Sequence, residues 1–214
     1  MVIPREARRV TYSSDIRNRK RVSLNQHQRA IIIGSILGDA GLYSNWSRTN
    51  YRLKVQQCLK QSVYVEWKYE ALAPLVLTPP QQYVRTRSVW FRTISHPELT
   101  RLHAVFYRDG KKIIPENIAE YLANPVTMAV WFMDDGNIKS GNGKVRGYNL
   151  NTQSFSREEN IRLRDAIEAV HGIDSSIEHN HHYYRLGIYH RQSREKFVSL
   201  VREFVIPSLQ YKIG

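Results

Sequence analysis

Two segments decide how this sequence folds: Ile31-Ile-Ile-Gly-Ser-Ile-Leu-Gly-Asp39 and Thr127-Met-Ala-Val-Trp-Phe-Met-Asp-Asp135. Each is mainly apolar and ends in a carboxylate, and the two terminal acids lie 96 residues apart. A helix that is apolar on every side must be buried, and Gly34 with Gly38 would let another backbone approach closely. The pattern therefore predicts two buried helices that pack against each other.

The same offset continues further along the chain. Gln57 and Gln153 each follow the carboxylate of their own half by 18 residues. The segments 83–94 and 179–190 are also related by this offset, and both are rich in β-branched and aromatic residues, as β-hairpins are. We therefore predict a duplicated chain, with a basic arm over 1–24, a first repeat over 25–118 and a second repeat over 119–214.

Each half reads helix, strand, strand, helix, strand, strand, helix, which predicts an α+β fold. The apolar 28–38 run and the amphipathic 63–72 segment are the first two helices. Residues 51–56 alternate apolar and polar side chains, as a half-buried strand does. In the second half, Ser156 with Glu159 three residues later forms a capping box that starts a helix.

Composition restricts the partner and the compartment. Lys and Arg number 32 against 19 Asp and Glu, which gives a formal net charge of +13. Such an imbalance attracts polyanions, so nucleic acid is the first candidate partner. The lone Cys58 excludes an internal disulfide and a cysteine-based zinc finger, which fits an intracellular, reducing compartment, either an organelle matrix or the cytoplasm or nucleoid. No apolar run approaches the ~20 residues that a membrane span requires.

Strand alternation on so basic a chain favours a nucleic-acid-binding face, where Arg and Gln read base edges and Lys holds phosphate. The predicted DNA-binding residues are Arg52, Lys54, Gln56, Arg85, Arg87, Arg92, Lys144, Arg146, Tyr148 and Arg185. The basic arm is either a solvated extension or a phosphate-contacting one, and both interpretations stay open. The string His179-Asn-His-His182 is interpreted as a polar hairpin tip, with phosphate contact as the alternative, because the ββα context and the partner ligands of a nuclease metal site are missing.

The two acids predict the chemistry. Packing the buried helices together brings Asp39 and Asp135 near a common axis. Each acid faces the negative end of a helix dipole, and the two acids also repel each other. Hard divalent ions such as Mg²⁺ resolve this conflict, because they prefer oxygen ligands and leave room for water and phosphate. This is the layout of two-metal phosphodiester hydrolysis.

The duplicated helix ending in Asp, the Gln that follows a strand and the basic hairpins resemble the LAGLIDADG homing endonucleases of the single-chain, two-repeat type. The resemblance covers about residues 27–213. It is carried by the strings Leu37-Gly-Asp-Ala40, Lys111-Lys-Ile-Ile-Pro115, Trp131-Phe-Met-Asp-Asp-Gly136, Leu150-Asn-Thr-Gln-Ser-Phe155 and Ile206-Pro-Ser-Leu-Gln-Tyr-Lys212. It implies two pseudo-symmetric αββαββα units whose saddle-shaped antiparallel sheets straddle a DNA major groove.

The resemblance also implies site residues. Asp39 and Asp135 match the family's metal-binding acids, and Lys112 and Lys212 match its active-site lysines. The polar positions near the nucleophilic water are matched by Gln57 and Gln153, with Gln56 as an alternative to the first.

The chain departs from the family's motif at two positions, and a second acid competes for the metal role. Ala40 stands where the motif ends in glycine, and it joins the candidate metal ligands together with Asp134. Asp134 competes with Asp135, and we choose Asp135 because it keeps the 96-residue register and precedes Gly136. Val130 replaces the early glycine of the second helix, which predicts a wider backbone spacing there.

We therefore predict a monomeric endonuclease that hydrolyses one phosphodiester per strand of an asymmetric double-stranded DNA site of about 20 base pairs. Its cofactor is expected to be Mg²⁺, with Mn²⁺ or Ca²⁺ able to substitute in binding. The resemblance implies short 3′ overhangs and a role in homing, and the chain length favours an intron-encoded or free-standing enzyme over an intein. The alternative is an RNA-binding maturase on the same scaffold, with host intron RNA as its partner.

Overall fold

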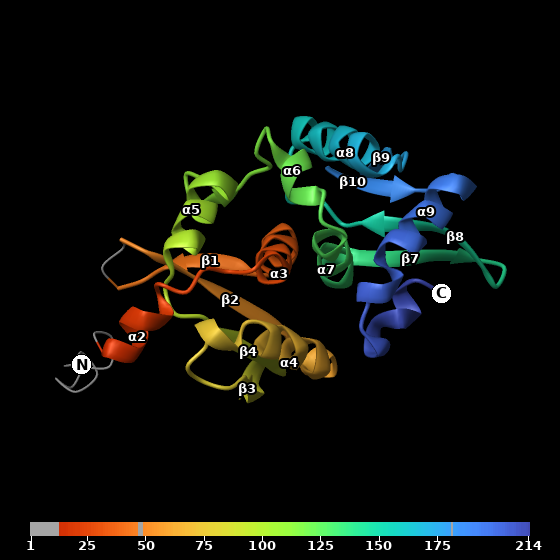
Figure 1. Cartoon of the computed structure of the whole chain (residues 1–214). Helices are drawn as coiled ribbons and strands as arrows, with labels where there is room; N and C mark the ends of the chain where they lie inside the picture. Colours follow the sequence, from red (N-terminus) through yellow and green to blue (C-terminus); the bar gives the residue numbers. More distant parts are fainter. Residues whose placement is uncertain (1–12, 47–48, 181) are drawn as a thin grey trace. The chain divides into compact units, whose positions relative to one another are not determined.

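The computed structural model describes residues 13–46, 49–180 and 182–214, and Figure 1 shows the order of the elements. Two four-stranded antiparallel sheets carry the fold, with strand orders β1-β2-β4-β3 and β7-β8-β10-β9. The first repeat consists of α3 (Gln26–Leu37), β1 (Gly41–Ser44), β2 (Tyr51–Cys58), α4 (Ser62–Ala71), β3 (Gln81–Tyr83), β4 (Ser88–Arg92) and α5 (Pro97–Phe106). The second consists of α7 (Pro125–Asp135), β7 (Gly136–Gly141), β8 (Lys144–Leu150), α8 (Arg157–His171), β9 (Ser176–Asn180), β10 (Tyr183–Ile188) and α9 (Arg191–Val201). The α+β prediction and the repeated αββαββα order are confirmed.

Short elements join and flank the repeats. The connection between them contains the hairpin of β5 (Tyr107–Arg108) and β6 (Lys111–Lys112) and the helix α6 (Ile118–Leu122). Single 3₁₀ turns are η1 (Leu59–Gln61), η2 (Ala73–Leu75), η3 (Val84–Thr86) and η4 (Arg202–Phe204), and the chain ends in η5 (Pro207–Lys212). Across the described ranges, no helix has both the length and the apolar character needed to cross a bilayer.

Part of the predicted basic arm forms the helix α2 (Ser14–Arg19). The Ser13 side chain accepts from the N–H of Ile16, and Ile16 itself is buried. The Arg19 guanidinium donates to the Pro74 carbonyl at 3.2 Å. This portion of the arm is therefore packed on the first sheet's unit, while residues 1–12 lie outside the described residues.

The chain packs as two compact units that do not coincide with the order of the repeats. Among the described residues, one unit contains those up to Gln28 and those of Gly41–His103, and the other contains those of Arg29–Ala40 and Ala104–Gly214. Most of α3 thus packs with the second repeat rather than with the sheet that follows it. The close approach of α3 to α7, the two motif helices, is the reason (Figure 1).

Glycine makes this approach possible. A Cβ atom built on Gly34 would lie 2.6 Å from the Thr127 carbonyl oxygen and 2.8 Å from Val130 Cβ. A Cβ atom on Gly38 would lie 2.4 Å from Asp134 Cβ. The bulk of Val130 thus occupies the space that Gly34 leaves open, and the predicted packing of the two apolar segments is present.

Local signals set the helix ends. Ser156 and Glu159 form the predicted capping box of α8, and Gly172 ends this helix in the left-handed conformation with φ 60°. Helix α7 starts with Asn124, whose side chain accepts from the Val126 N–H, and with Pro125 in its first turn. These caps fix where α7 begins and therefore where its terminal acid lies.

Each sheet has one face covered by helices. In the second unit, Phe132 from α7 packs edge-on against Phe197 from α9 and Tyr148 from β8, with ring centroids 4.9 and 5.9 Å apart. Leu186 and Ile188 of β10 are fully buried on the same side. In the first sheet, alternate residues of β2 are buried, as half-buried strands require. We call the other side of each sheet its outer face.

Candidate active site and nucleic-acid interface

The acidic residues of the site lie at the ends of the motif helices, within the second compact unit. Asp39 lies two residues beyond the end of α3 and is exposed, whereas Asp135 is the last residue of α7 and is partly buried. Asp134 is buried at 9% exposure, with its Cβ against Gly38 in the helix contact. Ala40 is buried, and its N–H donates to a carbonyl of the preceding helix. Asp134 is therefore a packing position, and Asp135 is the freer carboxylate.

Burial and neighbouring carboxylates both disfavour the charged form of Asp135. Burial, followed by the charges of Asp39 and Asp134, raises the pKa of Asp135 to about 7. Lys112 and Lys212 act in the opposite direction but do not cancel this rise. A bound cation would relieve the same repulsion.

The donor set fits a hard divalent cation shared with a ligand. Within the described ranges, no group of three or more His, Cys, Asp or Glu residues could hold a metal ion. Mg²⁺ commonly binds through one or two carboxylates and takes its other ligands from water and substrate phosphate. Two carboxylates, one from each motif helix, suit this mode.

The two lysines bind the C-terminal ends of the motif helices. Lys112 lies in β6, behind a tight turn in which Asp109 and Gly110 both have positive φ, and its Nζ donates to the Gly38 carbonyl at 2.6 Å. Lys212, at 9% exposure, donates to the Met133 carbonyl at 2.6 Å. The last carbonyls of a helix have no partner within the helix, so each ammonium satisfies one of them. Each lysine is thereby fixed beside an acid-tipped helix end.

The glutamines predicted near the nucleophilic water occupy unlike positions. Gln57 is at 9% exposure near the end of β2, on the covered side with Leu53 and Val55. Gln153 lies in a turn beyond the end of β8, where its side chain donates to Asn151 Oδ1 at 3.4 Å.

Strand pairing shows that the equal 18-residue spacing from acid to glutamine does not give the two glutamines equivalent places in the two sheets. Gly41 pairs with Lys54 in the first sheet, and Asn137, which is 96 residues after Gly41, pairs with Asn149 in the second. Lys54 and Asn149 are 95 residues apart, so the second strand of each repeat is offset by one residue. Carried past the end of β8, this offset sets Thr152 rather than Gln153 at the position that corresponds to Gln57. The role of the two glutamines stays a prediction.

Four predicted DNA-binding residues share the outer face of the first sheet: Arg52, Lys54, Gln56 and Arg92. Lys54 pairs with Arg92 across the strands, and its Nζ lies 5.7 Å from the ring centroid of Trp90 on the same face. Burial and the charge of Arg92 lower the pKa of Arg52. This face therefore gathers positive charge without an acid on its four strands.

Arg85 and Arg87 lie at the tip of the hairpin, outside its strands. Arg85 is in the 3₁₀ turn η3, and Arg87 follows it in the left-handed conformation with φ 46°. Both are exposed.

A β-bulge places two further predicted residues on the outer face of the second sheet. Lys139 pairs with Gly147, and the next residue of β7 pairs with Val145, so Arg146 has no partner between them. Such an extra residue redirects the side chains of its strand. Lys144 pairs with Gly141, and a Cβ on Gly141 would lie 3.5 Å from Arg146 Cγ, so both basic residues lie on one side.

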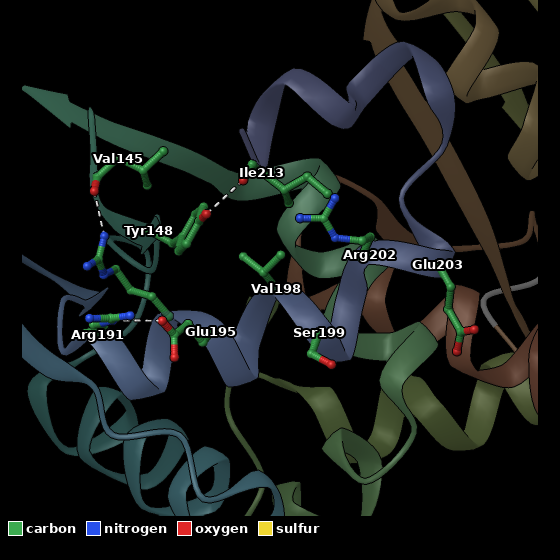
Figure 2. A pocket seen from close by; sticks show the side chains of 10 residues that line it. Val145, Tyr148, Arg191, Glu195, Val198, Ser199, Arg202, Glu203 and Ile213 are labelled. Atoms are coloured by element: carbon green, nitrogen blue, oxygen red, sulfur yellow. Dashed lines mark hydrogen bonds and ion pairs between the residues drawn. The ribbon is translucent and has the colours of Figure 1, made fainter. Parts of the chain in front are cut away.

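The prediction that Tyr148 binds DNA is wrong. Tyr148 is at 4% exposure on the covered face, and its hydroxyl donates to the Ile213 carbonyl at 2.8 Å. It lines a pocket of about 750 Å³ that is formed by β8, α9, η4 and Ile213. Figure 2 shows the side chains around this pocket. The aromatic contacts with Phe132 and Phe197 hold Tyr148 in the core.

The last predicted residue, Arg185, belongs to a group on the second outer face that was otherwise missed. Arg185 forms an ion pair with Glu178 at 2.8 Å, and Glu178 also contacts Lys139. Tyr189 adjoins this pair and lies over Gly147. A glycine inside a strand was the available signal, because it often marks a close approach by another group.

The fold and site together define a class: duplicated αββαββα proteins in which each motif helix ends in an acid and is capped by a lysine. Residues 29–197 match the model of the LAGLIDADG DNA endonuclease family. The chain belongs to this family, whose endonucleases use divalent metal ions.

Similar proteins include enzymes and longer chains. The chain is 26% identical over 214 residues to the DNA endonuclease I-ChuI of Chlamydomonas applanata. The alignment covers 90% of this chain and 97% of that protein. It is 28% identical over 204 residues to the RecA protein of Mycolicibacterium chitae, covering 89% of this chain but 47% of RecA. The chain thus spans about half the length of this curated relative. The structure of the homing endonuclease I-WcaI bound to its DNA recognition sequence matches with a TM-score of 0.85 and 26% identity, over 95% of this chain and 93% of that one.

Proposed function

We propose that this chain is a site-specific DNA endonuclease that hydrolyses one phosphodiester in each strand of a long, asymmetric double-stranded site. The observation that carries the proposal is the meeting of two acid-tipped helices, each with a lysine at its last carbonyls. A single chain supplies both carboxylates, so it acts as a monomer.

Asp39 and Asp135 hold the divalent ions, for which Mg²⁺ is the expected species. When bound, such ions stabilise the attacking and leaving oxygens of the scissile phosphate. Lys112 and Lys212 place positive charge beside the same phosphates, where it offsets the charge that develops during hydrolysis. Asp134 and Ala40 support the site through helix packing, because both are buried.

The outer faces of the two sheets bind the DNA. Each carries basic side chains projecting from neighbouring strands, and the chain has a net charge of +13. I-WcaI, whose fold this chain shares, is bound to its DNA recognition sequence. Because the two outer faces carry different side chains, the two halves of the site have different sequences.

Selection from a randomised library of DNA duplexes tests the proposal. The wild-type chain should cut a defined long site with Mg²⁺ and should not cut it with EDTA. Asp135→Asn provides the matched protein control, since it should bind the selected site without cutting it. Cleavage that persists in EDTA, or Asp135→Asn cutting at the wild-type rate, would overturn the proposal.

A further inference from the structure

On the second outer face, Tyr189 lies flat against two glycines. A Cβ atom on Gly147 would lie 2.2 Å from Tyr189 Cδ1, and one on Gly187 would lie 2.3 Å from Tyr189 Cε2. Real Cβ atoms do not come so close, so only glycine admits the ring at both positions. The Tyr189 ring is thereby held in one position against β8 and β10.

The Tyr189 ring and its hydroxyl contact Lys139. Lys139 Nζ lies 4.5 Å from the centroid of the Tyr189 ring and donates to its hydroxyl at 3.3 Å. The same hydroxyl donates to Asn149 Oδ1 at 2.7 Å, which fixes its direction. Asn149 is itself at 2% exposure, so the Tyr189 hydroxyl is anchored by a buried side-chain amide.

A single carboxylate joins this lysine to an arginine from another strand. Glu178 Oε2 accepts from Arg185 Nε at 2.8 Å, and Glu178 Oε1 lies 3.5 Å from Lys139 Nζ. Burial alone would raise the pKa of Glu178, but Tyr189, Arg185 and Lys139 together lower it. The carboxylate is therefore charged at neutral pH and is shared by two cations.

The network remains within reach of a ligand. The side chains of Lys139, Glu178 and Arg185 keep 48%, 24% and 25% of their exposure. Partly exposed ion pairs contribute little to folding stability, so stability alone is a weak reason for this arrangement. Long cationic side chains that are held in one geometry can instead select among base edges, whereas mobile ones contact phosphates of any sequence.

We propose that Glu178 and Tyr189 are positioning residues that fix Lys139 and Arg185 on the second outer face and so set base discrimination in one half of the DNA site. The inference rests on the proposed function. It also assigns the two sheets unequal roles, because the strands of the first sheet contain no acid that could hold Arg52, Lys54 or Arg92 in this way.

Cleavage profiling of Glu178→Gln tests the proposal. The wild-type site is selected first, and the single-turnover rate is then measured on every single-base-pair variant of it. Discrimination should fall about tenfold at positions in one half-site, within the range expected when an oriented donor pair is lost. Binding to random DNA should be retained or become tighter, because a negative charge beside phosphates is removed.

Two further variants keep the test decisive. Tyr189→Phe preserves the ring over the glycines but removes the hydroxyl, and it should relax discrimination in the same half-site. Glu168→Gln, which makes the same charge change on the exposed side of α8, should leave the profile unchanged. Melting temperatures of all variants confirm that the compared proteins are folded.

The failures can be told apart. If the wild-type chain selects no site, the proposed function fails and this inference falls with it. If a site is selected but Glu178→Gln and Tyr189→Phe keep wild-type discrimination within twofold, only the positioning role is refuted. Equal relaxation in both half-sites would likewise overturn it, because it would show a general charge effect.

Discussion

Substituting alanine for Gly38 should disturb the contact between the two motif helices without changing Asp39 or Asp135, the two proposed metal ligands. The new Cβ would lie 2.4 Å from Asp134 Cβ and 2.7 Å from Asp134 Oδ2, whereas ordinary contacts begin at 3.4 Å. The carboxylate oxygen can rotate away, but the Asp134 Cβ is fixed to the backbone of α7. The two motif helices must therefore separate by about 1 Å, a shift that overpacked cores resist at a cost of about 1–3 kcal/mol.

The catalytic effect should exceed this loss of stability. Asp39 is the residue directly after Gly38, so a shift of the helix end displaces its carboxylate relative to Asp135. Misplacement of about 1 Å can cost roughly 10²-fold in rate. We therefore expect Gly38→Ala to fold and bind DNA, yet to cut about a hundredfold more slowly in single-turnover assays with saturating Mg²⁺.

A compensating substitution checks the cause. Asp134→Gly removes the atoms that Gly38→Ala would meet, so the double variant should recover part of the stability and of the cleavage rate. Urea denaturation of the four proteins gives the coupling free energy, which should exceed ~0.5 kcal/mol, the limit for independent sites. Additive losses, or a Gly38→Ala variant that cuts at the wild-type rate, would refute the explanation by helix spacing.

Four further predictions follow from the acids, the lysines and the outer faces. Asp39→Asn and Asp135→Asn should each abolish double-strand cleavage and keep specific binding, which gel-shift and plasmid assays measure together. The unfolding free energy of the metal-free protein should fall as the pH rises from about 4 to 7 because folding raises the pKa of Asp135, and Asp135→Asn should flatten this slope in denaturation series. Lys112→Met or Lys212→Met should slow single-turnover cleavage far more than it weakens binding, while Lys111→Met, which removes an exposed neighbouring lysine, should not slow it. Cleavage rates of the first two variants within about twofold of wild type, only ~0.4 kcal/mol in the activation barrier, would contradict this role. The selected DNA site should be asymmetric and span about 20 base pairs. A palindrome or a site of six to eight base pairs would contradict the proposal that the outer faces of both sheets bind the DNA.

The motif helices could be predicted because their signals are local. Apolar character on all sides, the glycines of the first helix and the terminal acids are all readable without knowledge of the partner. The capping box of α8 is equally local. By contrast, the role of Lys212 as the cap of a helix about eighty residues earlier depends on the tertiary fold, and only the family resemblance pointed to this residue.

The facing of Tyr148 escaped prediction because the face on which a residue lies depends on strand pairing as well as on alternation. Arg146 and Tyr148 are two residues apart, so simple alternation assigns them to the same face. The bulge leaves Arg146 unpaired and turns it to the outer face, while Tyr148 stays in the core. The one-residue offset that separates Gln57 from Gln153 has the same origin, since an extra or missing residue in a hairpin leaves no trace in side-chain composition. A glycine inside the strand was the overlooked signal for the bulge. Gly147 adjoins the bulge and leaves room for the Tyr189 ring, so its position marks where regular alternation on the second outer face ends.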